Sequence, residues 1–277
     1  MGYLLLAIAC SAALSFVMRL STGRTRGHFS LIATNYLVCA VLGAAFSDLS
    51  ALGRADSLGM TVGLGAINGV VLLSGLILLQ LSTRKHGIVL SSLFMKLGLL
   101  VPFVVSILFF KEIPTWLQVA GFCVAIGAIV LFNLKQDGQK GRLGIALFLL
   151  LIMNGASDAL VKIFEELGPA DLSDPFLCLS FSVAFVLCLG LVLYKKERPD
   201  GKALLFGALI GVANFFSFKF LLAALPHVPA VVAFPTYSVA AMLTVTLGGV
   251  LLFQERLTKR QWLAFAGVIM ALVMLNI

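Results

Sequence analysis

The feature that most constrains this chain is a series of long apolar runs separated by short polar connections. A helix needs about 17–25 mostly apolar residues to cross a bilayer. Apolar residues make up 61% of the sequence and charged residues 12%, whereas soluble domains average about 45–50% and about 25%. A soluble fold of this size cannot cover so much apolar surface. The proportions exclude a water-soluble enzyme, a nucleic-acid-binding domain and a disordered chain, and they predict an all-α integral membrane protein.

The apolar runs predict ten transmembrane helices in one helical bundle. Polar segments such as Arg84–Gly87 and Lys195–Gly201 mark the connections, and no connection is long enough to form a soluble domain of useful size. We expect the spans at residues 3–19, 29–47, 58–80, 87–110, 115–134, 142–164, 174–194, 202–224, 228–253 and 258–277.

The basic residues lie mainly in alternate connections between these spans. Fifteen of the 20 Lys and Arg residues fall on one side of the expected membrane, and only Arg54 and Lys111 lie in connections on the other side. Cytoplasmic loops carry the excess of Lys and Arg, so we expect both termini to lie outside the cytoplasm. Membrane topology explains the net charge of +8, and we expect no nucleic-acid partner.

An internal repeat relates residues 110–118 to residues 253–261 at an offset of 143. The phrase Phe-x-Glu-x-x-Thr-x-x-Gln occurs at both places. Each half of the chain, residues 1–134 and 142–277, then holds five spans, and an odd number of spans makes the halves antiparallel across the membrane. Inverted repeats are typical of secondary transporters, whose substrate site lies near the middle of the bilayer. We therefore predict two inverted five-helix repeats.

The glutamates of the repeated phrase, Glu112 and Glu255, each precede a Thr-x-x-Gln sequence at the end of a span. Thr115–Gln118 and Thr258–Gln261 fit the capping box, in which both side chains satisfy backbone N–H groups at a helix start. We therefore interpret both glutamates as structural rather than as proton sites.

Ten spans, a five-plus-five repeat and this phrase at the ends of the fourth and ninth spans resemble the drug/metabolite transporter superfamily. Within it, the chain resembles the EamA-type permeases of bacterial inner membranes over essentially its whole length. The resemblance implies that the first, third, fourth, sixth, eighth and ninth spans line a central cavity. It also implies a multi-pass protein of the inner membrane that moves a small molecule across the lipid bilayer. Many members are drawn with cytoplasmic termini, which is opposite to the expectation from charge.

Lys96 lies near the middle of the fourth span, where a lysine costs about 2.5–3.5 kcal/mol. Such a charge needs a partner or a wet cavity, and the expected partner is Asp158 in the sixth span. Asn154, Asp158 and Lys162 follow one another at four-residue intervals and so share one helix face. We expect this group to line the cavity and contact substrate or a proton. The alternative is that Asp158 pairs with Lys162 or Lys96 only to hold helices together.

Three further polar residues are candidate substrate or coupling-ion ligands. Lys219 in the eighth span points about 140° away from Asn214 at 100° per residue, and its alternative is snorkelling to the membrane surface. Asn68 in the third span lies at roughly the height of Asn214, as the repeat requires. Amides also hold membrane helices together, so this is the alternative for both asparagines.

Pro102 in the fourth span and Pro235 in the ninth each remove a backbone hydrogen bond inside an apolar helix. Discontinuous helices in corresponding halves indicate the binding region of a transporter. Tyr237 follows Pro235 closely, and we include it among the cavity residues.

The charges within the spans favour a negatively charged group on the substrate, because Lys96, Lys162 and Lys219 outnumber Asp158. We predict a secondary transporter of a small anionic or zwitterionic metabolite, such as an amino acid or an organic acid. It would work by alternating access, coupled to protons or uncoupled as in a facilitator, as a monomer or a homodimer. The alternatives are an exporter of drugs and other cationic compounds with the same fold, a channel and an intramembrane enzyme.

No catalytic residue, metal site or cofactor is predicted. The sequence has no catalytic triad, P-loop or dinucleotide motif. The five cysteines occur singly, without metal-ligand spacing, so we interpret them as small buried apolar residues.

Overall fold

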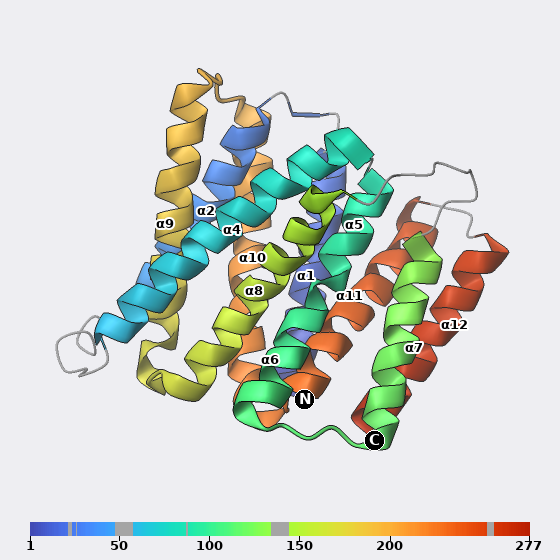
Figure 1. The fold of residues 1–277 in the computed structure, drawn as a ribbon. Helices are drawn as coiled ribbons and strands as arrows, with labels where there is room; N and C mark the ends of the chain where they lie inside the picture. The colour runs from blue at the N-terminus through green and yellow to red at the C-terminus, as the bar shows by residue number, and fades with distance from the viewer. Residues whose placement is uncertain (22–23, 26, 48–57, 87, 134–143, 254–257) are drawn as a thin grey trace. The chain divides into compact units, whose positions relative to one another are not determined.

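The computed structural model describes residues 1–21, 24–25, 27–47, 58–86, 88–133, 144–253 and 258–277, and Figure 1 shows the chain as a ribbon. Within these ranges the chain is helical and contains no strand, which confirms the all-α prediction. The long helices are α1 (Gly2–Ser21), α2 (His28–Phe46), α4 (Leu58–His86), α5 (Ile88–Lys96), α6 (Leu100–Phe110), α7 (Trp116–Asn133), α8 (Ile145–Leu167), α9 (Ser173–Tyr194), α10 (Gly201–Ala224), α11 (Ala230–Phe253) and α12 (Lys259–Asn276). Short 3₁₀ helices occur at η1 (Leu97–Leu99), η2 (Ala170–Leu172) and η3 (Leu225–His227).

Among the described residues, eight helical segments are long and apolar enough to cross a membrane. A ninth apolar helix, Trp116–Leu131, is shorter, and α12 is not among the eight. Large apolar side chains point away from the protein: Leu5 is 67% exposed and Phe109 is 74% exposed. Lipid would solvate such side chains, whereas water would not. The structure thus supports a multi-pass membrane protein, and the count of ten spans stays a prediction.

The chain divides into two compact units, each built from segments of both halves of the sequence. The first unit consists of Met1–Leu73 and Ile163–Pro226, and the second of Ser74–Lys162 and His227–Ile277. Helices α4 and α8 each contribute residues to both units. These units do not coincide with the two predicted repeats, residues 1–134 and 142–277, which are defined by the order of helices in the chain. The repeats stay a prediction.

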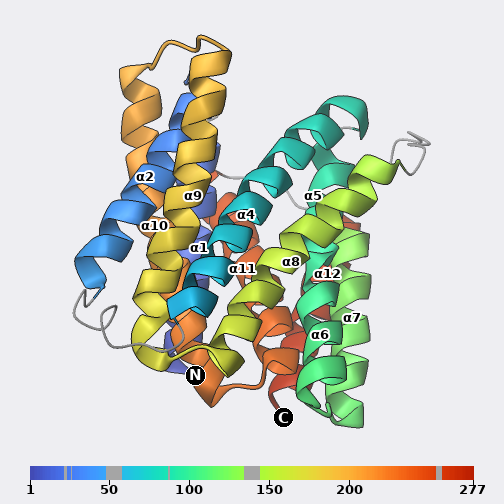
Figure 2. The ribbon, with the colours of Figure 1, turned by 60° about the vertical axis from the view of Figure 1, so that its left-hand side comes forward.

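In the first unit, α10 packs against α1 and α2, and α2 also packs against α9. Figures 1 and 2 both show α2 beside α9 and α10. Gly211 of α10 permits this packing, because a Cβ there would lie 2.7 Å from the backbone oxygen of Asn35 in α2. Small residues allow such close backbone approach between membrane helices.

In the second unit, α7 packs along α12, and α11 contacts α6, α7 and α12. The rings of Phe103 in α6 and Phe122 in α7 stack with their centroids 3.7 Å apart. Gly121 lies against α12, where a Cβ would come within 3.2 Å of the backbone nitrogen of Leu275. These contacts hold α6, α7, α11 and α12 together.

Both predicted capping boxes are confirmed. Thr115 N donates to Gln118 Oε1 at 3.0 Å, and Gln118 N donates to Thr115 Oγ1 at 3.3 Å. Thr258 and Gln261 form the same reciprocal pair at the start of α12. Glu255 lies outside the described residues.

Candidate functional site

The fourth predicted span is interrupted in its middle. Helix α5 ends at Lys96, the chain makes a 3₁₀ turn over Leu97–Leu99, and α6 begins at Leu100. Pro102 accounts for the break, because it has no N–H to donate to the carbonyl of Gly98 and its ring crowds that carbonyl. The irregularity in this half of the chain is thus a single 3₁₀ turn, across which Ser91–Phe110 remains one helical segment long enough to span a membrane.

The corresponding prediction for the other half is wrong, because α11 continues through Pro235. Pro235 is the sixth residue of α11. A proline so close to a helix start leaves only about one turn of helix before it, and it removes the single hydrogen bond to Val231.

The interruption lies against α8 at a very close backbone approach. A Cβ on Gly98 would lie 3.0 Å from the backbone nitrogen of Gly155, and a Cβ on Gly155 would collide with the backbone oxygen of Gly98 and the side chain of Val101. Only two glycines can pack in this way. The pair therefore sets the distance between the broken span and α8.

Three predicted site residues meet beside this glycine pair. Asn154 Nδ2 donates to the backbone oxygen of Met95 at 3.0 Å, which ties α8 to the last turn of α5. Lys96 and Asp158 are both half-buried and interact electrostatically. The structure therefore brings Lys96, Asn154 and Asp158 together in the second unit, with Lys96 at the point where the helix is interrupted.

Lys162, one helical turn beyond Asp158, forms an ion pair that the sequence analysis did not predict. Its Nζ lies 2.9 Å from Glu112 Oε1, and its side chain is 2% exposed. The other carboxylate oxygen of Glu112 accepts a hydrogen bond from Val231 N at 2.9 Å. Glu112 therefore links the end of α6 to α8 and to the first turn of α11, a structural role carried by an ion pair rather than by capping alone.

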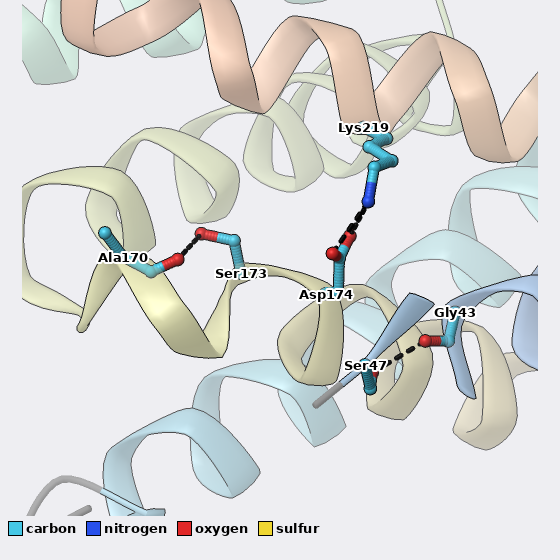
Figure 3. Close-up of polar contacts among 6 residues, drawn as sticks. All are labelled: Gly43, Ser47, Ala170, Ser173, Asp174 and Lys219. Carbon is cyan, nitrogen blue, oxygen red and sulfur yellow. Dashed lines mark hydrogen bonds and ion pairs between the residues drawn. The ribbon is translucent and has the colours of Figure 1, made fainter. Parts of the chain in front are cut away.

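Lys219 in the first unit also has a carboxylate partner. Its Nζ lies 2.6 Å from Oδ1 and 2.7 Å from Oδ2 of Asp174, in the first turn of α9. Figure 3 shows the two side chains pointing at each other from α10 and α9. The ammonium also lies 4.4 Å from the centroid of the Phe46 ring. Lys219 is thus held by an ion pair and a cation–π contact.

The two amides each join a pair of helices in the first unit. Asn68 Nδ2 donates to Ser180 Oγ at 3.2 Å, between α4 and α9. Asn214 Nδ2 donates to Asn35 Oδ1 at 3.2 Å, between α10 and α2. These contacts are those of residues that hold helices together.

The predicted site residues therefore form two groups. Asn68, Asn214 and Lys219 belong to the first unit. The second unit contains Lys96, Asn154, Asp158, Lys162 and Tyr237, of which Tyr237 is half-buried on α11.

The sequence does not directly indicate Glu112 and Asp174 as charge partners, because each lies near the end of a span and on a different segment from its lysine. A comparison of predicted depths could have found them. Glu112 and Lys162 lie at the ends of spans on the same predicted side of the membrane. Asp174 begins a span on that side, and Lys219 lies near the end of another.

The comparison with protein families decides the identity of the second half of the chain. The EamA-like transporter family matches residues 142–277. These residues belong to the EamA-like transporter family. With eight candidate spans among its described residues, the chain is a multi-pass membrane protein, and the match of its second half to a transporter family is consistent with membership of the drug/metabolite transporter superfamily.

Two further proteins are similar to this chain over nearly its whole length. An uncharacterised protein of Haemophilus influenzae is 26% identical over 290 residues, which cover 98% of this chain and 95% of the relative. A crystal structure of another protein aligns with a TM-score of 0.72 at 15% identity, and covers 98% of this chain and 94% of the other. The second comparison shows that the fold is one found in a solved structure.

Within the described ranges, no group of three or more His, Cys, Asp or Glu residues is placed so that it could hold a metal ion. The described site residues form paired charges and amide hydrogen bonds.

Proposed function

We propose that this protein is a secondary transporter that moves a small zwitterionic metabolite, such as an amino acid, across the bacterial inner membrane by alternating access. The observation that carries this proposal is the 3₁₀ turn in the middle of the fourth span, beside Lys96 and Asp158, because a 3₁₀ stretch inside a helix often marks a functional hinge. Transporters commonly build their binding sites at discontinuous membrane helices, and an ionisable residue at such a place is expected to be functional. Lys96 and Asp158 would contact the substrate, and Asn154 would hold the broken helix in position.

The pairing of the charges within the spans favours a zwitterion within the predicted substrate class. Lys162 pairs with Glu112 and Lys219 with Asp174. The excess of positive charge inferred from the sequence disappears once these two carboxylates are counted. A buried charge that loses its partner is strongly destabilising. A zwitterion can replace both partners of an ion pair, whereas an anion or a cation leaves one partner uncompensated.

The order and packing of the helices support two inverted five-helix repeats. An offset of 143 carries residues 116–133 of α7 onto residues 259–276, which are those of α12. The same offset carries α2 onto the region of α9. Both pairs of corresponding helices pack against each other, α7 with α12 and α2 with α9. Such pairing is expected for two halves related by an approximate twofold axis.

Asp158 is the group through which we propose that protons are coupled to transport. The substrate ammonium would compensate the charge of Asp158 when the zwitterion is bound, and a proton would compensate it when Asp158 has no other cation beside it, so substrate binding would release the proton. An imposed proton gradient would then drive accumulation of substrate, whereas in a facilitator the gradient would have no effect.

Flux measurements in proteoliposomes test the substrate class. Purified protein is reconstituted, and uptake is measured for amino acids, organic acids and organic cations, with protein-free liposomes as the blank. We expect saturable uptake of amino acids that exceeds uptake of the other two classes. Uptake of cations alone would contradict the argument from charge, and flux that never saturates would favour a channel.

A further inference from the structure

The first unit contains a cavity that none of the roles above uses. It has a volume of about 270 Å³ and lies where α8 ends, α9 begins and α10 ends. Small-molecule pockets usually measure about 300–1,000 Å³, so this cavity suits a ligand smaller than a typical drug. Most of its wall is apolar, formed by residues such as Phe164, Leu177, Leu222 and Pro226.

One wall of the cavity carries the Lys219–Asp174 ion pair. Lys219, Asp174 and a second carboxylate, Glu165, all line the cavity. Figure 3 shows the ion pair next to Ser173, whose hydroxyl donates to the backbone oxygen of Ala170 at 2.8 Å. Each partner of the ion pair is 25% exposed, so both can be reached from the cavity. The cavity therefore combines an apolar wall with one accessible pair of opposite charges.

The ammonium of Lys219 is held in place independently of Asp174. It lies 4.4 Å from the centroid of the Phe46 ring and 5.9 Å from that of Phe215. Aromatic rings attract a cation over this range of distances. Lys219 would therefore keep its position when another carboxylate took the place of Asp174.

We propose that this cavity is a second substrate-recognition site, which binds an α-amino acid with an aliphatic side chain and in which the Lys219–Asp174 pair is the latch that the ligand opens. The ligand carboxylate pairs with Lys219, its ammonium pairs with Asp174, and its side chain lies on the apolar wall. One ion pair is exchanged for two, and no charge loses its partner. The inference rests on the proposed function for the ligand's class, but it concerns a different set of residues.

Three probes with the same branched apolar body test the recognition of both charges. Leucine carries both charges, 3-methylbutylamine lacks the carboxylate and 4-methylpentanoate lacks the ammonium. Ser173→Cys places a thiol in the cavity wall. Its alkylation by a maleimide is followed at residue 173 by mass spectrometry in the full-length protein. We expect leucine to protect the thiol, and each single-charge probe to need at least a tenfold higher concentration. Equal protection by all three probes would overturn the proposal.

Variants in the Ser173→Cys background then locate the bound ligand. Ala223→Leu fills the cavity and keeps its charges, and the double change Asp174→Asn with Lys219→Met removes the latch without leaving a lone charge. We expect alkylation to continue in both and protection by leucine to be lost. Lys195→Met is the matched control, because Lys195 also lies over a phenylalanine ring, 4.3 Å from the Phe29 centroid, but outside the cavity. Protection that survives both cavity variants would overturn the proposal.

Flux in proteoliposomes separates this inference from the proposed function. Leucine uptake without protection of residue 173 would overturn the cavity site and leave the transport function standing. Protection that follows the expected pattern without amino-acid uptake would support the cavity site and contradict the proposed substrate class of the transporter.

Discussion

Lys162 Nζ lies 2.9 Å from Glu112 Oε1, with 2% of the lysine side chain exposed. Because Glu112 also accepts a hydrogen bond from Val231 N, this pair joins the end of α6 to α8 and to the start of α11. A buried ion pair adds little stability over a well-packed apolar replacement, but removal of one partner is strongly destabilising. The loss of one charge of this pair should therefore lower the stability of the second unit.

Glu112→Gln should lower the free energy of unfolding by about 3–5 kcal/mol, because it leaves the Lys162 ammonium buried without its carboxylate. Denaturant titration in detergent measures the loss. The double change Glu112→Leu with Lys162→Met should recover most of it. Glu166→Gln is the control: Glu166 is exposed on α8, the helix that carries Lys162, and an ion pair at an exposed site is worth about 0–1 kcal/mol. A Glu112→Gln protein as stable as the parent would show that the ion pair does not contribute to the free energy of unfolding.

Gly155→Ala should destabilise the protein by about 1–3 kcal/mol, the usual cost of overpacking. The added Cβ would collide with the Gly98 carbonyl and force α8 away from the broken span. Gly127 of α7 is the matched control, since a Cβ there has no atom within 4 Å. Gly127→Ala should leave stability unchanged or raise it, because alanine favours helix. Thermal unfolding of the two variants measures the difference, and equal stability would contradict the close packing of α8 on the broken span.

The helices could be predicted from the sequence because lipid imposes a simple rule on length and polarity. The expected span at 174–194 corresponds to α9 at Ser173–Tyr194, and that at 115–134 to α7 at Trp116–Asn133. The break beside Lys96 was also predictable, since Pro102 necessarily removes a hydrogen bond. Pro235 showed the limit of this reasoning, because the effect of a proline depends on how much helix precedes it.

The charge partners could not be predicted in the same way, because they depend on which helices are neighbours. Asn154 and Asp158 share a helix face by spacing alone, and the structure brings that face to Lys96. Nothing in the spacing of Glu112 and Lys162 indicates their contact, since they lie on different helices. Lys219 and Asp174 are related in the same way, and the two pairings together remove the predicted excess of positive charge.

The predicted orientation of the protein rests on the distribution of basic residues and can be tested separately from its fold. A reporter fused after Ile277 should report from outside the cytoplasm, and one inserted at Lys195–Lys202 should report from inside it. Two reporters are used at each position. One is active only in the cytoplasm, and the other is active only outside it. The opposite pair of results would overturn the charge-based orientation and leave the helices as they are.

The most direct test of the central claim is the flux of the proposed substrate through Asp158→Asn protein in proteoliposomes. The amide keeps the shape of the side chain and changes helix propensity little, so the protein should still insert. We expect flux to be abolished, as it should be in Lys96→Met. The double variant should recover stability, because neither charge is left alone, but it should not recover flux. Asp171→Asn, which changes an exposed carboxylate, should transport normally. Wild-type flux through Asp158→Asn at both acidic and neutral pH would contradict the account and reduce the Lys96–Asp158 group to a contact between helices.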